Sequence, residues 1–296
     1  MKDVYVERRN GVDEIVQQDD ELLQIPSAYS QLNLLQKVRF KASEHSRFDY
    51  AFHYSETSPY GRYDRHNRFR NGLPRYAEWN YGPQKWMMNL LSFKNDKATA
   101  FYDEVQIRMA HQLFNESRIS RDLNDPERSI REEEVEALSF NLDLQKSLGA
   151  RHQLFYGAEV VNNDVRSDGR LKNIENGIVM DDADRYPQSQ WMSAAVFATD
   201  EFALNEKTDI QAGLRYNYFM IDADFSDNLP YYPLPYDKVE INNAALSGSL
   251  GAVYRPNEKW VIKTNLGTAF RAPNVDDIGK VFDSEPGAVV VPNPEL

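Results

Sequence analysis

Arginine and aromatic side chains are interleaved along one polar segment of this sequence, between residues 58 and 84. The candidate ligand-binding residues of this segment are Tyr60, Arg62, Tyr63, Arg65, His66, Arg68, Arg70, Trp79 and Tyr81. Guanidinium groups bind anions, and aromatic faces stack on planar ligands and on cations. In a chain whose formal net charge is −12, this local positive charge predicts a site for an anion such as an iron chelate, a haem carboxylate or a lipopolysaccharide phosphate. The alternative is a solvated loop, or one that contacts lipopolysaccharide.

Two further features could carry chemistry. Tyr231, Tyr232 and Tyr236 lie among prolines, a pattern typical either of a rigid stacking surface or of a stiffened loop. His66 has a side chain that can ligate a metal or haem iron, but a lone histidine in a polar segment is more often simply exposed. The remaining histidines and the acidic clusters lack the spacing of known metal sites. The sequence therefore predicts neither a resident metal nor a cofactor.

Composition narrows the function classes. The sequence pI is about 5.0, and phosphate repels so acidic a chain, which argues against non-specific nucleic-acid binding. Cysteine is absent, which excludes disulfides and thiolate metal sites. The motifs G-x-S-x-G and H-E-x-x-H and the Walker motif do not occur, so the sequence does not point to an enzyme.

Apolar and polar residues alternate strictly along many stretches, as in Phe48, Tyr50, Phe52 and Tyr54, which are separated by polar or small residues. Successive side chains of a strand point to opposite faces, so each such stretch has one apolar and one polar face. The pattern predicts about ten strands. They lie near residues 31–43, 46–57, 85–95, 98–114, 131–146, 151–165, 190–203, 208–222, 242–254 and 259–270.

The predicted connections alternate between short and long. The short ones are residues 43–46, 95–97, 147–151, 204–207 and 256–258, and the long ones are 58–84, 115–130, 166–189 and 223–241. Short turns on one side and long loops on the other are typical of bacterial outer-membrane barrels. We therefore predict an all-β fold: an antiparallel up-and-down meander forming part of a transmembrane β-barrel. Its apolar face would meet outer-membrane lipid and lipopolysaccharide, and its polar face would line the lumen.

The last predicted strand runs into Phe270, Arg271, Ala272 and Pro273, and the chain closes with Asn293, Pro294, Glu295 and Leu296. This order resembles the two motifs of TonB-dependent receptors, an FRAP-like box and an NPxL-like box. In that segment Pro273 ends ladder pairing, Asn274 can cap a short helix, and Arg271 can anchor a loop. The haem-importing branch of the family has a histidine between the boxes, and this sequence has none there.

The resemblance implies uptake of an iron chelate, siderophore or haem, or of a similar nutrient, across the outer membrane. It also implies a plug domain that contacts the TonB complex, and no segment of residues 1–296 can be assigned to that plug. We therefore expect a partial barrel domain. The alternatives are a small outer-membrane protease or lipase, which would need paired carboxylates and histidine at the rim, and a passive porin or adhesin.

Overall fold

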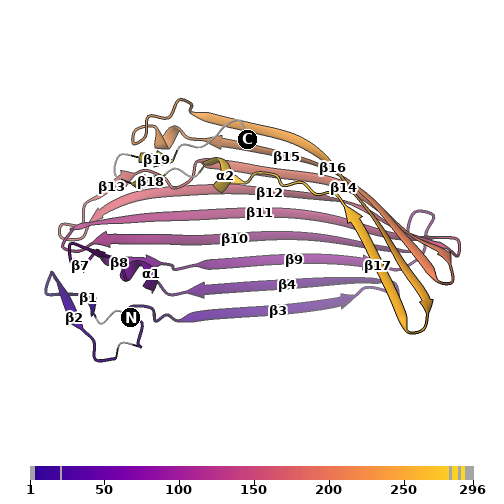
Figure 1. Ribbon diagram of the computed structural model, residues 1–296, viewed down its shortest axis with the longest axis horizontal. Helices are drawn as coiled ribbons and strands as arrows, with labels where there is room; N and C mark the ends of the chain where they lie inside the picture. Colours follow the sequence, from indigo (N-terminus) through magenta and orange to yellow (C-terminus); the bar gives the residue numbers. More distant parts are fainter. Residues whose placement is uncertain (1–3, 21, 280–281, 286–287, 291–296) are drawn as a thin grey trace.

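The alternating pattern folds into one curved, open antiparallel sheet in the computed structural model of the protein (Figure 1). The structure describes residues 4–20, 22–279, 282–285 and 288–290. Ten long strands lie side by side in the order β17-β16-β15-β14-β12-β11-β10-β9-β4-β3. Neighbouring strands are therefore neighbours in sequence as well, apart from short inserted elements. This arrangement confirms the predicted up-and-down meander.

The ten long strands match the ten predicted ones, two of them with the predicted ends and eight with different ends. They are β3 (Gln31–Lys41), β4 (Ser46–Thr57), β9 (Lys85–Asn95), β10 (Glu104–Asp122), β11 (Glu127–Leu148), β12 (His152–Asn173), β14 (Gln188–Asn205), β15 (Thr208–Asp224), β16 (Lys238–Asn257) and β17 (Trp260–Gly267). The smaller strands are β1 (Val4–Arg9), β2 (Val12–Gln17), β5 (Tyr60–Gly61), β6 (Phe69–Arg70), β7 (Leu73–Pro74), β8 (Tyr76–Tyr81), β13 (Val179–Asp182), β18 (Phe282–Glu285) and β19 (Ala288–Val290). The helices are α1 (Tyr63–His66), α2 (Val275–Gly279) and the 3-10 turn η1 (Ser226–Asn228).

The two faces of the sheet differ as the alternation predicts. Large apolar side chains such as Leu138, Leu214 and Leu246 are 52%, 62% and 68% exposed on one face. The opposite face carries cross-strand polar pairs, because directly opposed residues of two strands share a face. There the Arg108 guanidinium donates to Asp143 at 2.7 Å. We call the two surfaces the apolar face and the polar face.

The polar face carries a hydrogen-bond ladder among residues of three strands, β11, β12 and β15. The Glu159 carboxylate of β12 accepts from Asn141 of β11 at 2.9 Å and from Arg215 of β15 at 2.7 Å. Arg215 also donates to the Asn217 side-chain oxygen at 2.7 Å. The charges of this ladder are thus paired or hydrogen-bonded by their neighbours, as a polar surface in contact with water or another domain requires.

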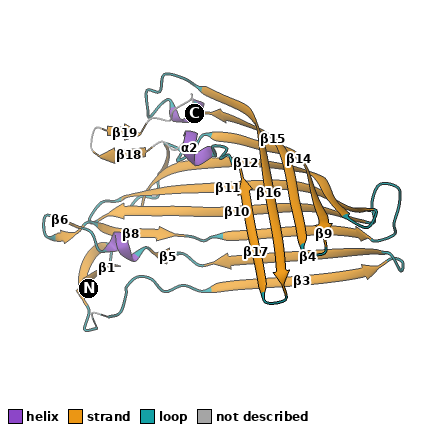
Figure 2. Ribbon diagram, turned by 45° about the vertical axis from the view of Figure 1, so that its right-hand side comes forward, coloured by secondary structure: helices purple, strands orange, loops and turns teal. Residues whose placement is uncertain are grey.

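The connections between strands differ in length at the two ends of the sheet. Short turns join strands at one end of the sheet, the turn end, and longer segments and both α-helices lie at the other, the loop end (Figure 2). Several predicted boundaries at these ends were wrong. β10 begins at Glu104 rather than at residue 98, because the Thr99 side chain and Lys146 hold residues 99–103 in a turn.

The predicted long loop 115–130 was also wrong. The β10–β11 ladder continues to the Ser120–Ser129 pair, and a tight turn with Asn124 at φ 62° closes the hairpin. Both faces of the hairpin are polar here, so no apolar alternation reveals the strands in the sequence. β12 and β14 also extend beyond their predicted limits, and β13 pairs with the added part of β12.

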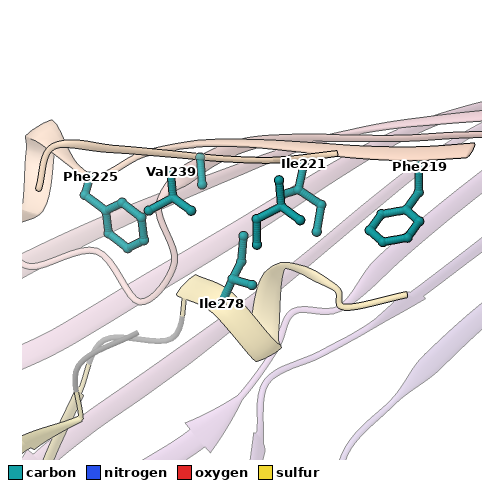
Figure 3. Packing of buried hydrophobic residues seen from close by; sticks show 7 residues of the cluster. Phe219, Ile221, Phe225, Val239 and Ile278 are labelled. Carbon is teal, nitrogen blue, oxygen red and sulfur yellow. The ribbon is translucent and has the colours of Figure 1, made fainter. Parts of the chain in front are cut away.

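The main apolar cluster lies on the polar face at the loop end, where α2 packs against β15 and β16 (Figure 3). Ile278 of α2 and Ile221 of β15 are both fully buried, and Phe225 and Val239 complete the contact. The helix begins with the predicted cap: the Asn274 side chain accepts from the Asp277 N–H at 2.9 Å, and Asp277 accepts from the Asn274 N–H at 3.0 Å. This reciprocal pair satisfies two helix-terminal donors.

Placing a charge on the apolar face is expected to prevent stable insertion. Leu214→Arg should cost roughly 2–4 kcal/mol if the residue lies near the middle of the bilayer. Gln211→Arg is the matched control, because Gln211 lies on the polar face of the same strand and already donates to Glu201. Folded protein in outer membranes, measured by heat-modifiable migration in gels, should fall for Leu214→Arg alone. Equal loss in both variants would contradict the assignment of the faces.

Candidate ligand-binding site at the loop end

The arginine-rich segment 58–84 is ordered and folds back onto the sheet. β9 pairs with β10 up to Asn115, and beyond that point β8 takes its place, with Tyr81 opposite Arg118 and Trp79 opposite Ser120. Because Arg118 lies on the polar face, Trp79 and Tyr81 lie on that face as well. The segment therefore presents its aromatic residues to the lumenal side of the sheet.

Three guanidinium groups stack on these two rings. Arg62 lies 5.1 Å from the Trp79 ring centroid and 5.4 Å from that of Tyr81, and it donates to the Tyr81 hydroxyl at 2.8 Å. Arg65 lies 5.6 Å from the Trp79 centroid, and Arg118 lies 5.6 Å from the Tyr81 centroid. The two rings meet edge to face at 5.2 Å. With the Tyr60 ring beside Tyr81, we call Tyr60, Arg62, Arg65, Trp79, Tyr81 and Arg118 the arginine–aromatic cluster.

The structure thus brings together five of the nine candidates from this segment and adds Arg118. Arg118 is absent from the candidates because it lies within the stretch predicted as a loop. Its even-numbered spacing from Arg108 and Gln112 on the same strand is the signal that could have placed it on the polar face. Tyr63 is the first residue of α1.

Three candidates lie elsewhere. His66 is only 2% exposed, and its Nε2 lies 3.1 Å from the Trp79 carbonyl oxygen. The expectation that His66 is solvent-exposed was wrong, because α1 packs against β8 and encloses the ring. Arg68 and Arg70 are exposed in the β6–β7 hairpin, whose Asn71–Gly72 turn has φ values of 53° and 78°. This backbone geometry suits a tight two-residue hairpin loop.

The three tyrosines of the proline-rich segment also lie in different surroundings. Tyr232 and Tyr236 pack against the apolar cluster under β15, and the Tyr236 ring meets Phe225 edge to face at 5.4 Å. Tyr231 is 40% exposed. The segment is thus held mainly by packing, and two of its three tyrosines stabilise the loop end.

Of the family-type motif, Phe270 is 41% exposed and Ala272 packs against the apolar cluster. Arg271 donates twice to Asp277, at 2.6 and 2.7 Å, and so ties the box to α2. The Pro273 carbonyl accepts from the Trp191 indole at 3.3 Å. These contacts anchor the segment to the wall. Asn293, Pro294 and Leu296 lie outside the described residues.

A buried carboxylate lies beside the arginine–aromatic cluster. Glu133 of β11 is 5% exposed, is opposed by Glu116 of β10, and lies 3.1 Å from Arg118. Burial raises the pKa of Glu133 to about 7, against the attraction of Arg118. The loop that follows β13 passes over this place, since the Arg185 and Tyr186 N–H groups donate to Ser167, the neighbour of Glu133 on β12.

The loop end is further tied to the N-terminal hairpin. Arg121 of β10 and Asp13 of β2 are both buried and form two hydrogen bonds, at 2.7 and 2.8 Å. Arg121 also donates to Glu78 at 2.9 Å, and Arg128 donates to the same carboxylate at 2.8 Å. This network joins β1–β2, β8, β10 and β11.

The described residues contain neither a metal-binding cluster nor a membrane-spanning helix. No group of three or more His, Asp or Glu side chains in that part of the chain is arranged to hold a metal ion. No helix there is long and apolar enough to cross a membrane.

Residues 19–296 match the family model "TonB dependent receptor-like, beta-barrel". The chain belongs to the TonB-dependent receptor family. Members of this family are transporters of the bacterial outer membrane and not enzymes, so the protease, lipase and passive-porin alternatives are set aside. The loop end of this receptor wall is therefore its extracellular end, and the turn end faces the periplasm.

Solved structures of the same family share the fold. The copper transporter OprC has a TM-score of 0.67 and 12% identity, over 86% of this chain and 38% of that protein. The hemophore receptor HasR of Serratia marcescens has 0.65 and 14%, over 90% and 40%. The ferric yersiniabactin receptor FyuA of Yersinia pestis has 0.60 and 13%, over 80% and 37%. The receptor chain thus spans about two fifths of their length. No curated protein sequence matches it significantly.

The receptor's hairpin network should weaken in acid. Burial opposes the charge of Asp13, but hydrogen bonds from Arg121 and the Asn124 N–H lower its pKa from 3.8 to about 2. A lowered folded-state pKa stabilises the docked hairpin above pH 3.8, and this contribution is lost as pH falls through about 2. Asp13→Asn should release β1–β2 even at neutral pH, seen as faster proteolysis of residues 18–30. Glu14→Gln, which alters an exposed neighbour, is expected to leave proteolysis unchanged, and equal cleavage of both variants would contradict this role.

The packing of the loop over β12 should weaken as pH rises because of Glu133, whereas the hairpin network of Asp13 weakens as pH falls. Since the folded-state pKa is raised, its contribution to loop packing is full below 4.5 and declines as pH rises through about 7. Glu133→Gln should reduce the pH dependence of proteolysis of residues 183–187 between these values, and the part that remains belongs to Asp184, whose pKa burial raises to about 6. Glu132→Gln is the control, because Glu132 is 52% exposed and pairs with Arg170. A pH dependence as large in Glu133→Gln as in the wild type would contradict the assignment.

Proposed function

We propose that this chain forms part of the barrel of a receptor that imports an anionic iron chelate by TonB-dependent transport. The arginine–aromatic cluster is the observation that carries the proposal. It lies on the lumenal face at the extracellular end, where a ligand arriving from outside first meets the barrel. The chelate would be a siderophore complex, haem or a similar nutrient, and a plug domain and the TonB complex would be the partners.

The cluster is suited to an anion because its arginines are held in place but not enclosed. The side chains of Arg62 and Arg65 are 32% and 29% exposed, and that of Arg118 is 18% exposed. Asp64 accepts from the Arg62 Nε at 2.7 Å, which leaves the far side of the guanidinium directed at the rings. Side chains that are already ordered lose little entropy when a ligand binds.

Haem ligation through histidine has weaker support than binding of another anionic chelate. His66, the one histidine of the arginine-rich segment, is buried against the Trp79 carbonyl. The sequence has no histidine between Pro273 and Asn293. The proposal therefore favours a ferric chelate that carries carboxylate or other anionic groups, recognised by charge and stacking.

Removing one stacked guanidinium should reduce binding. In the intact receptor, Arg62→Ala should weaken binding of an anionic ferric chelate by about tenfold, as loss of a partly desolvated cation–π and ionic contact implies. Binding is measured by quenching of tryptophan fluorescence, and uptake by growth of a receptor-deletion strain complemented with each variant. Ferric citrate, a ferric catecholate, a ferric hydroxamate and haem serve as the separate sole iron sources.

Arg70→Ala is the matched control, since Arg70 belongs to the same segment but lies in the exposed β6–β7 hairpin. It should bind and grow like the wild type. Equal defects in Arg62→Ala and Arg70→Ala would refute the role of the cluster. If the deletion strain grew normally on every iron source, haem included, iron uptake itself would be refuted.

A further inference from the structure

The apolar face has a polar interruption inside its lipid-facing belt. Asn89 of β9 lies directly opposite His111 of β10, and Asn162 of β12 lies opposite Leu138 of β11, which in turn opposes His111. These residues form one row across four strands. Polar groups facing hydrocarbon are costly, so a row of them calls for partners.

The row borders a groove on the same face, of about 430 Å³. Its floor is formed by Leu91, Met109, Phe140 and Val160, and Tyr50 lies at one side. The groove is continuous with the belt of exposed apolar side chains that the family fold places in the outer membrane. Its natural occupant is therefore a component of that membrane.

Protein partners satisfy only part of this row. His111 Nε2 lies 2.9 Å from Glu136, and the Tyr50 hydroxyl donates to the Asn89 side-chain oxygen at 2.7 Å. Within the described part of the chain, the Asn89 amide nitrogen and the Asn162 side chain make no hydrogen bond. An unsatisfied amide in an apolar setting is unfavourable, so these groups are available to a polar atom of the occupant.

The polar and apolar parts of the groove follow each other along the membrane normal in the same order as those of an outer-leaflet lipid. Within the groove the polar row lies nearer the extracellular end than the floor: Asn89 precedes Leu91 on a descending strand, and Asn162 follows Val160 on an ascending one. Beyond the row, Met87 and Leu113 continue the apolar face on β9 and β10, and Glu136 and Asp164 follow on β11 and β12. The polar row therefore faces the headgroup side and the apolar floor faces the membrane centre. A molecule with a polar linkage above an acyl chain fits in this orientation.

We propose that this groove binds an acyl chain of a lipopolysaccharide molecule, with Asn89, His111 and Asn162 hydrogen-bonded to the hydroxyl, ester or amide groups that join acyl chain to sugar. Just above the row, the same face carries Glu136 and Asp164. The cations of this region, Lys85 and Arg166, pair with Glu56 and with Glu134 and Asp164, so phosphate pairing is not the main attraction. Recognition rests on the chain and its polar linkage. Lipid A with one or two phosphates should therefore bind equally well.

Filling the groove tests this site. The intact receptor is purified in detergent, stripped of lipid and titrated with hexa-acylated lipid A, and native mass spectrometry counts the lipid retained. Val160→Trp should lower the lipid A affinity by about tenfold. Val196→Trp is the matched control, because Val196 lies on the same face of β14, is 57% exposed, and does not line the groove. It should retain lipid A like the wild type.

Asn162→Leu, which keeps the branched shape of the side chain, tests the polar row separately and replaces Val160→Trp if that variant does not fold. It too should lower lipid A retention while Val196→Trp does not. Equal retention by the groove variants and the control would overturn the proposal. So would a phosphatidylethanolamine that competes equally with lipid A, since the occupant would then be any two-chain lipid. Because iron uptake is not measured, this result is independent of the proposed transport function.

Discussion

A backbone N–H or C=O group in hydrocarbon has no water to bind, so every strand that crosses the membrane must pair fully with its neighbours. In this protein that requirement produces long, uninterrupted ladders, such as the 22 residues of β11 paired with β12. Pairing in turn fixes register, and register fixes which side chains meet lipid and which meet the lumen. The two faces, the polar ladder around Glu159 and the site at the extracellular end all follow from it.

The strands continue past the membrane and so carry the candidate site on rigid structure. β8 takes over from β9 as the partner of β10, and this exchange brings Trp79 and Tyr81 to the same face as Arg118. The buried pair of Arg121 and Asp13 holds the adjoining hairpin. A site built on paired strands keeps its geometry better than one on a free loop, and this suits recognition by stacked rings and guanidinium groups.

The sequence predicts the part of the fold where the two faces differ in polarity. All ten long strands and the Asn274 cap are confirmed, because lipid or a helix terminus imposes a visible pattern on residue types. The extension of β10 beyond Asn115 escaped prediction because its residues are polar on both faces. The burial of His66 and the pairing of β8 depend on contacts between distant segments, which periodicity does not encode. The residue types of the arginine–aromatic cluster were evident, and their assembly was not.

The exchange of β9 for β8 beside β10 has an evolutionary consequence. Deleting or inserting a single residue in β10 between the membrane and Arg118 would rotate every later side chain to the opposite surface. Arg118 would leave the rings, and its place would be taken by Ser117 after an insertion or by Ile119 after a deletion. During evolution, the length of β10 above the membrane can therefore change only in steps of two residues, or in steps absorbed by a bulge such as the one at Arg121 and Asp122. Related receptors can change what they recognise by substitution far more readily than by changing the length of this strand.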